Sequence, residues 1–450
     1  MKTKEKLVIF TCVLTSILPL LDTTVVTVVL GDMAHSFSLQ SNEISWVMTA
    51  YLMGMAVMIP IVPMISNCCG VLRTWVGALI IFALGSLIGG FSSPYFSVLV
   101  IARLLQGLGA GLLVPLVQII LVNAFGKENL RMIMSYVGIP AAFIPAIAPL
   151  FGALISTHFS WQALFLLNLP IILFTILLGY PYIPRSELAT GKSYRLTGLV
   201  LVCLGYTAIL YLLKEGKFFI HSSLSYLLVF GLSAMLLVGG IWQLYYQKNS
   251  AIQLKGFRSL GYSIAILSSF IVGIIFFGFL VLYPTVRSQL DAQQSLNFIG
   301  VMLCIQGVGT LISRSYMKRE SIRQVNSLLL IPMGLLIAGV ATFLLTLSVH
   351  SLWIESLAFL IRGLGIGVAS IAVLSAPLEW ASKEIYADTS SLSRMMLQLG
   401  GALGVFAAAG LAGLSYRESY GVFALMTIML ALGLLLAGNY VLRQRNQVIG

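Results

Sequence analysis

The chain has 450 residues, of which 59% are hydrophobic and 9% are charged, and its mean hydropathy is +1.00. A soluble protein carries roughly 25% charged residues because its surface faces water, so this composition excludes a soluble enzyme. The net charge of +12 requires no nucleic-acid partner, since basic loops and attraction to anionic lipid head groups account for it. The composition therefore predicts a chain that lies mostly in the lipid bilayer.

Fourteen apolar stretches are long enough to cross a membrane as helices, for which about 20 residues are needed. They do not alternate apolar with polar residues as barrel strands do, so we predict an all-α polytopic membrane protein. In chain order the predicted spans are about 7–30, 44–66, 74–92, 95–124, 131–155, 161–180, 195–213, 223–245, 259–284, 296–314, 326–347, 351–375, 391–415 and 418–443.

The basic residues predict the orientation of these spans. With the N-terminus inside, twenty of the 26 Lys and Arg residues fall in inner segments and four in outer loops, while Arg103 and Arg362 lie within spans. This bias follows the positive-inside rule. We therefore expect a multi-pass protein of the cytoplasmic (inner) membrane with both termini cytoplasmic.

Two long basic loops, Pro181 to Arg195 and Tyr246 to Arg258, divide the spans into groups of six, two and six. We predict an N-terminal six-helix bundle over residues 1–182 and a C-terminal six-helix bundle over 259–450. Between them, residues 183–258 form an inserted helix pair with flanking cytoplasmic loops.

An internal repeat supports two related bundles. Residues 97–116 align without gaps with 353–372, so that Gly107 and Gly111 fall on Gly363 and Gly367. Both segments are the fourth span of their six-span group, as a duplication predicts. Small residues at this spacing allow close helix packing, and duplicated bundles with a site between them are typical of secondary transporters.

Five segments carry motifs of one known family. They are LPLLDTTVVTVVL (18–30), with Leu21, Asp22, Thr24 and Val26; WVMTAYLM, with Trp46, Thr49 and Tyr51; IARLLQGLGAGLLVP, with Arg103, Gln106, Gly107, Gly109, Gly111 and Pro115; WQALFLLNLP, with Trp161, Phe165, Asn168 and Pro170; and LQLGGALG (397–404), with Leu397 in the place of an Arg.

These motifs resemble the fourteen-span drug:proton antiporter branch of the major facilitator superfamily, from about residue 17 to 440 and most closely in the first 180. The resemblance implies two six-helix bundles of the major facilitator fold plus two inserted central helices. It also implies alternating access, a monomer, and a role in multidrug efflux.

Two motifs depart from the family pattern. The loop after the second span retains Asn67, Gly70 and Arg73, but Asn67 replaces an Asp and further arginines are missing, so gating can differ. The antiporter motif of span five, normally Gly-Pro-x-x-Gly-Gly, keeps only Pro149 and Gly152. We expect these five residues, with Gln106, Gly107 and Gly111, to serve gating and helix packing.

Charges within spans cost about 2.5–3.5 kcal/mol on insertion scales and persist mostly for function. Asp22 lies near the middle of the first span. When deprotonated it would attract a cationic substrate, so that proton and substrate compete for one group, as coupled antiport requires. The alternative is an Asp that only caps or pairs. For Asp32, Glu43 and Glu355, near the predicted outer ends, we expect side chains that reach the interface.

Arg103 has two interpretations: it tunes Asp22 near the proton path, or it bonds backbone carbonyls to fix helix packing. Arg362 aligns with Gln106 and could bind an anionic substrate group. The candidate substrate-binding residues, for which ordinary packing is the alternative, are Tyr51, Gln118, Phe143, Gln306, Arg362 and Gln398.

The sequence contains no phosphate-binding glycine loop, no nucleophile–base pairing and no metal-ligand spacing. We expect no enzyme, no catalytic residue, no metal and no cofactor, with transport driven by the proton gradient. The favoured function is proton-coupled export of amphipathic small molecules. The alternatives are a dedicated exporter of one metabolite, such as a metallophore or other anionic compound, and a transport-dead membrane sensor or scaffold.

Overall fold

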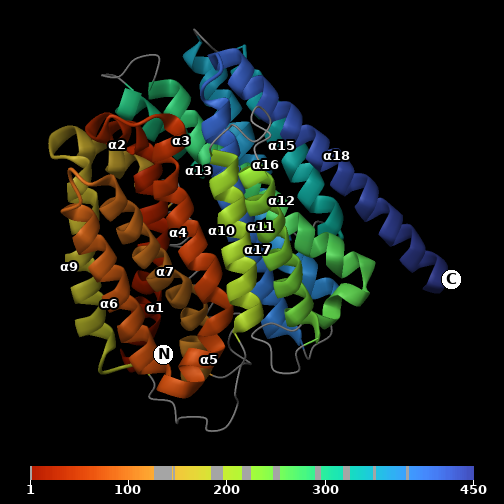
Figure 1. Cartoon of the computed structure of the whole chain (residues 1–450), viewed down its shortest axis with the longest axis horizontal. Coiled ribbons are helices and arrows are strands. Elements are labelled where there is room, and N and C mark those ends of the chain that lie inside the picture. The colour runs from red at the N-terminus through yellow and green to blue at the C-terminus, as the bar shows by residue number, and fades with distance from the viewer. Residues whose placement is uncertain are drawn as a thin grey trace.

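The computed structural model describes residues 3–125, 144, 147–183, 196–214, 224–246, 254–288, 295–317, 325–347, 351–381 and 385–449. Every regular element within these ranges is a helix, and most run side by side along one direction (Figure 1). The principal helices are α1 (Thr3–Val28), α2 (Leu30–Phe37), α3 (Ser41–Ile44), α4 (Trp46–Met58), α5 (Val62–Cys69), α6 (Val71–Gly90), α7 (Phe96–Phe125), α9 (Trp161–Gly179), α10 (Thr197–Lys214), α11 (Leu224–Tyr246), α12 (Leu260–Ser288), α13 (Ser295–Tyr316), α15 (Ser327–Leu345), α16 (Leu352–Trp380), α17 (Tyr386–Leu411) and α18 (Tyr416–Ile449).

Twelve helical segments in the described ranges are long and apolar enough to cross a membrane. Two shorter apolar helices, Ile147–His158 and Thr197–Leu212, lie at the predicted fifth and seventh spans. The first part of the fifth span lies outside the described residues. The prediction of an all-α polytopic protein is confirmed, with a helical segment at each of the fourteen predicted positions.

The second span is broken where proline and glycine require it. The short 3₁₀ helix Ile59–Ile61 joins α4 to α5 and contains Pro60, whose nitrogen carries no hydrogen for the helical ladder. Gly70 then separates α5 from α6 with a φ of 83°, which glycine adopts without the strain that a Cβ brings. Gly70 therefore makes the sharp turn between spans two and three.

Close helix contacts repeat in the two halves of the chain. Gly107 of α7 lies directly against the backbone carbonyl of Tyr51 in α4, and Gly363 of α16 lies against that of Gln306 in α13. Gly109 meets α6 in the same way that Gly365 meets α15. Glycine is required because a Cβ would collide with the neighbouring backbone. The aligned glycines thus occupy equivalent packing positions, with Tyr51 and Gln306 as structural counterparts.

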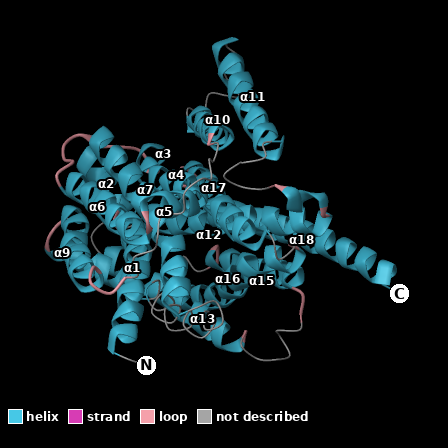
Figure 2. Cartoon of the chain, turned by 90° about the horizontal axis from the view of Figure 1, so that it is seen from below, coloured by secondary structure: helices cyan, strands magenta, loops and turns pink. Residues whose placement is uncertain are grey.

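The helix pair α10–α11 lies outside the other helices (Figure 2). α10 packs against α4 and α17, one helix from each half, and the Tyr206 hydroxyl donates to the Leu399 carbonyl at 2.5 Å. α11 packs on α10 and exposes a row of large apolar side chains that includes Leu232, Met235 and Trp242. The inserted pair therefore bridges the two halves along one seam.

The halves also meet at the end of the molecule where α2 and α3 lie, at the top of Figure 1; we call this the α2/α3 end. A Cβ on Gly31 would contact Ser288 at 3.2 Å, and one on Gly300 would lie 2.9 Å from the Pro149 carbonyl oxygen. The rings of Trp46 and Phe406 pack edge to face with centroids 5.1 Å apart. The α2/α3 end is closed by contacts between the N-terminal and C-terminal helices.

We predict that Gly363→Ala lowers the stability of the folded protein by about 1–3 kcal/mol, the usual effect of overpacking, because its Cβ would meet the Gln306 carbonyl. Gly231→Ala in α11 is the matched control, since no atom of another described helix lies within 4 Å of its added Cβ. Thermal unfolding of the purified protein in detergent measures both. Equal midpoints for Gly363→Ala and wild type would contradict the packing assignment.

Candidate functional site

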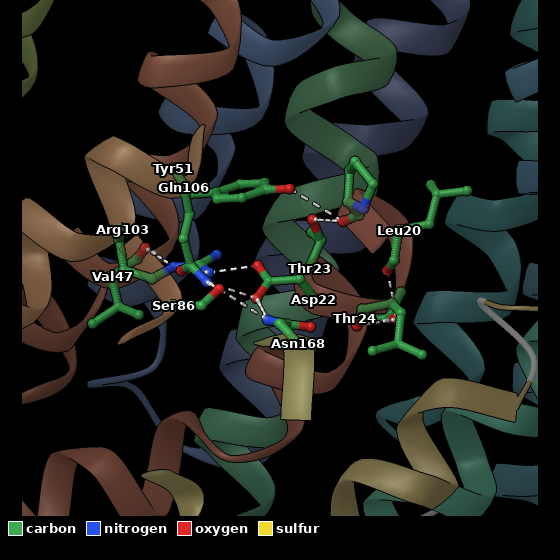
Figure 3. Close-up of polar contacts among 12 residues, drawn as sticks. Leu20, Asp22, Thr23, Thr24, Val47, Tyr51, Ser86, Arg103, Gln106 and Asn168 are labelled. Atoms are coloured by element: carbon green, nitrogen blue, oxygen red, sulfur yellow. Dashed lines mark hydrogen bonds and ion pairs between the residues drawn. The ribbon is translucent and has the colours of Figure 1, made fainter. Parts of the chain in front are cut away.

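The carboxylate of Asp22 is buried in the N-terminal half, with 2% of the side chain exposed. Arg103 Nη1 lies 2.5 Å from its Oδ2, and Asn168 Nδ2 donates to its Oδ1 at 3.1 Å (Figure 3). Gln106 Nε2 donates to the same Oδ1 at 3.3 Å. One guanidinium and two amides from α7 and α9 therefore surround the carboxylate of α1, which satisfies an ionised acid.

Arg103 makes the contacts of both predicted roles, the pairing with Asp22 and the hydrogen bond to a backbone carbonyl. Besides the ion pair, its Nε donates to the Val47 carbonyl of α4 at 3.1 Å, and Nη1 donates to Gln106 Oε1 at 2.7 Å. The guanidinium lies over the Tyr51 ring, 4.2 Å from the centroid. Its Nη2 has no hydrogen-bond partner among the described residues. The side chain is fully buried, so Arg103 both pairs with Asp22 and ties α7 to α4.

Two residues of this cluster were not predicted as site residues. Asn168 was recognised only as part of a family motif, and Ser86 was not singled out. Ser86 Oγ accepts from Gln106 Nε2 at 2.8 Å and from Asn168 Nδ2 at 3.4 Å. The available signal was the Asn168 amide in the middle of the apolar run of α9 and the Ser86 hydroxyl in the apolar run of α6.

A second polar cluster surrounds Arg362 in the C-terminal half. Its Nε donates to Thr342 Oγ1 at 3.2 Å, and its Nη1 donates to Gln306 Oε1 at 3.0 Å. Its Nη2 donates to the Ile275 carbonyl at 3.3 Å, and the guanidinium lies 3.4 Å from the centroid of Phe279. All of these partners are neutral. Arg362 is 1% exposed and forms no ion pair with any described residue.

The other candidate substrate residues divide between these clusters and the remaining chain. Tyr51 is buried beside Arg103, and its hydroxyl donates to the Pro19 carbonyl at 3.2 Å. Gln398 is buried in α17, and its Oε1 has no described partner. Gln118 is half-buried in α7, and Phe143 lies outside the described residues. The structure thus brings Tyr51 to Asp22 and Gln306 to Arg362.

The predicted gating residues lie in three parts of the structure. Asn67 and Arg73 are exposed on either side of the Gly70 turn. Gln106 belongs to the Asp22 cluster, and a Cβ on Gly111 would meet the Met55 backbone. A Cβ on Gly152 would meet Val25 of α1, and the carbonyl of Pro149 faces Gly300 across the two halves.

We expected the Glu355 side chain to reach the interface, and the structure shows that it does not, because α16 turns this side chain inward. It is 2% exposed and accepts a hydrogen bond from the Tyr283 hydroxyl at 2.9 Å. Asp32 and Glu43 are half-exposed. Partial burial raises the pKa of Asp32, while hydrogen bonding from Ser156 Oγ at 2.7 Å and the nearby His35 act to lower it.

Comparison with known proteins places this architecture among membrane transporters. The family model of the Major Facilitator Superfamily matches residues 12–404. The chain is 26% identical over 403 residues to "Multidrug resistance protein B homolog" of Mycobacterium tuberculosis, covering 87% of this chain and 73% of the relative. It is 27% identical over 416 residues to "Putative multidrug resistance protein MdtD" of Salmonella heidelberg, covering 89% and 85%.

Solved transporter structures share the fold. The POT family transporter PepTSo matches with a TM-score of 0.73 at 12% identity, covering 99% of each chain. A D-xylose-proton symporter matches with a TM-score of 0.70 at 14% identity, covering 96% of this chain and 97% of that one. At these identities the likeness concerns the fold alone.

We predict that Arg103→Met destabilises the protein by about 3–5 kcal/mol, because it leaves the buried Asp22 carboxylate without its cation. The double variant Asp22→Asn/Arg103→Met should be more stable than Arg103→Met alone, since no charge then remains unpaired. Thermal or denaturant unfolding of wild type, both single variants and the double variant measures the coupling. Strictly additive effects would show that the two side chains do not interact.

Proposed function

Because this chain belongs to the major facilitator superfamily, a family of multi-pass membrane transporters for small molecules, we propose that it is a proton-coupled exporter of amphipathic compounds, cationic or neutral. The match confirms the resemblance seen in the sequence motifs and places the chain among transporters rather than enzymes. The relatives named for multidrug resistance support efflux as the direction. The observation that carries the proposal is the buried Asp22–Arg103 ion pair.

Asp22 provides one group for which proton and substrate compete. In its ionised form it is held by Arg103, Gln106 and Asn168. A proton on the carboxyl removes the ion pair and frees the guanidinium, whereas a cationic substrate competes for the same negative charge. Mutually exclusive occupation of one carboxylate links outward substrate movement to inward proton movement. When the exported substrate is neutral, a proton that crosses with its charge gains about 2.3 kcal/mol per 100 mV, which is roughly a 50-fold concentration ratio.

Alternating access follows from the two halves and their seam. We place the α2/α3 end outside and both termini in the cytoplasm, in accordance with the basic inner segments. Contacts at Gly31, Gly300 and Trp46 close this end, which supports assignment to an outward-closed state. We expect the protein to be a monomer in the inner membrane. Rocking of the halves about Asp22 would open the α2/α3 end. The retained Asp22–Arg103 pair also argues against a transport-dead sensor or scaffold.

The decisive experiment is transport of ethidium, a lipophilic cation, into proteoliposomes with an acidic interior. We expect wild type to accumulate ethidium while protons leave, and Asp22→Asn to lose gradient-driven accumulation, because an amide does not ionise and so cannot carry a proton between the two sides. Asp22→Glu should retain part of it, and Asp32→Asn, which removes a half-exposed carboxylate, should behave as wild type. If accumulation by Asp22→Asn equals that of wild type, the coupling role of Asp22 is wrong.

One observation favours a second candidate function, export of a single anionic metabolite: Arg362 is a buried guanidinium whose partners are all neutral. We expect that Arg362→Gln leaves ethidium transport by the multidrug exporter intact. An anion exporter would instead transport an amphipathic anion such as carboxyfluorescein and lose at least about tenfold in rate in Arg362→Gln, since hydrogen bonds to charged groups contribute about 1.5–3 kcal/mol. Parallel assays with both dyes discriminate the two functions.

A further inference from the structure

A second buried carboxyl group lies in the C-terminal half, and the coupling mechanism does not use it. Glu355 is as buried as Asp22, each with 2% of its side chain exposed. Asp22 has a guanidinium and two amides, whereas Glu355 accepts one hydrogen bond, from the neutral hydroxyl of Tyr283 at 2.9 Å. No described cationic group lies within ion-pair distance of Glu355. The two acids therefore stand in opposite electrostatic environments.

The surroundings of Glu355 are aromatic. The rings of Tyr283 and Phe359 pack edge to face, with centroids 4.5 Å apart. The centroids of the Tyr283 and Tyr420 rings are 6.3 Å apart. Tyr420 is fully buried, and its hydroxyl has no hydrogen-bond partner among the described residues. An ionised carboxylate in so apolar a place would lack most of the donors that it needs. This environment suits the neutral carboxyl.

Among the described residues, the cation that acts on this cluster electrostatically is Arg287. The groups that act on Glu355 are Arg287 and Tyr283 of α12, and Tyr420 of α18, whose ring packs on Tyr416, completes the cluster. The Arg287 guanidinium does not bind the carboxylate. It lies over the Phe298 ring of α13, 4.5 Å from the centroid.

The Arg287–Phe298 contact lies between two junctions of the halves. Ser288, next to Arg287, meets Gly31, and Gly300, two residues after Phe298, meets Pro149. Opening of the α2/α3 end must separate both pairs, so the end of α12 beside Arg287 loses its contact with α2 and the start of α13 beside Phe298 loses its contact with Pro149. Arg287 is then free to leave Phe298 and pair with Glu355. Closure of this end and the charge on Glu355 are therefore linked through Arg287.

We propose that Glu355 is a second proton-binding site, which takes a proton from the solution at the α2/α3 end and holds that end closed. With the proton bound, the neutral carboxyl stays buried with Tyr283. When the proton leaves to the same solution, the carboxylate requires a cation, and Arg287 supplies it in the open state. Acid at this end then favours closure. The inference rests on the proposed alternating access, but it requires neither substrate nor a coupled proton at Asp22.

The first measurement is infrared difference spectroscopy of the purified protein during a pH titration. We expect wild type to show the carbonyl band of a protonated, buried carboxyl at neutral pH, sensitive to deuterium exchange. This band should be lost in Glu355→Gln and retained in Asp32→Asn. Tyr283→Phe should move the band to higher frequency, because the carboxyl loses its hydrogen bond. Superimposable spectra of wild type and Glu355→Gln would overturn the proposal.

The second measurement is the distance between spin labels across the α2/α3 end, at Gln40→Cys and Leu414→Cys, with Cys68, Cys69 and Cys304 replaced by Ser. We expect the open fraction of wild type to rise from acidic to alkaline pH and this dependence to be lost in Glu355→Gln, which stays closed. Asp32→Asn should keep it. An unchanged dependence in Glu355→Gln overturns the proposal. If Glu355→Gln does not fold, the carboxyl infrared band of Tyr283→Phe is the test. A band at the same frequency as in wild type overturns the proposal.

Both readouts are made without substrate and without a gradient. Failure of ethidium export would therefore refute the proposed function while the titration of Glu355 remained measurable. Conversely, Asp22→Asn can lose ethidium transport as expected while the infrared spectra of wild type and Glu355→Gln are superimposable. That result would refute only the second proton site.

Discussion

The constraint on which the rest of the structure depends is that a buried charge must be matched. Removing two ions from water is expensive, and their attraction compensates only when geometry is good and the remaining donors and acceptors are satisfied. Gln106, Asn168 and the Val47 carbonyl supply most of the partners that Asp22 and Arg103 need, and Arg103 Nη2 is left without a described one. Four helices, α1, α4, α7 and α9, are thereby held in one arrangement. A pair of this kind adds little net stability, so its retention points to a role in which one charge changes.

The C-terminal half accommodates its buried charges in a different way. Arg362 occupies the position of Gln106, and Phe359 occupies that of Arg103. Because the cation has moved by one turn, the C-terminal half has no counterpart of the Asp22 ion pair. Its guanidinium lies on Phe279 with neutral acceptors, and its buried acid, Glu355, lies seven residues earlier in α16. At a rise of about 1.5 Å per residue, some 10 Å of helix separates the two groups.

Sequence patterns predicted those features that depend on local composition. Apolar length predicted the helical segments, and the glycine repeat predicted equivalent packing positions, because both follow from chemistry within a single span. Asp22, Arg103 and Gln106 could be predicted from motif and from the rarity of charge in lipid. Ser86, Tyr283 and Tyr420 could not, since a lone hydroxyl in an apolar run has no meaning until another helix places an acid beside it. The interfacial expectation for Glu355 was wrong for the same reason: position along a span does not determine which way α16 faces.

The two buried acids have complementary requirements when the molecule changes state. Asp22 is satisfied as an ion inside one half, so a proton that reaches it releases a cation and loosens contacts among α1, α4, α7 and α9. Glu355 is satisfied as a neutral group by Tyr283. Loss of its proton would leave a carboxylate that requires a cation, which Arg287, beside the contacts that join the halves, would supply. In the proposed mechanism, protonation acts on internal packing at Asp22 and on closure at Glu355. The two effects can be separate because the halves have diverged in where they keep their charges: Glu355 stands where the N-terminal repeat has Leu99, and Arg362 where it has Gln106.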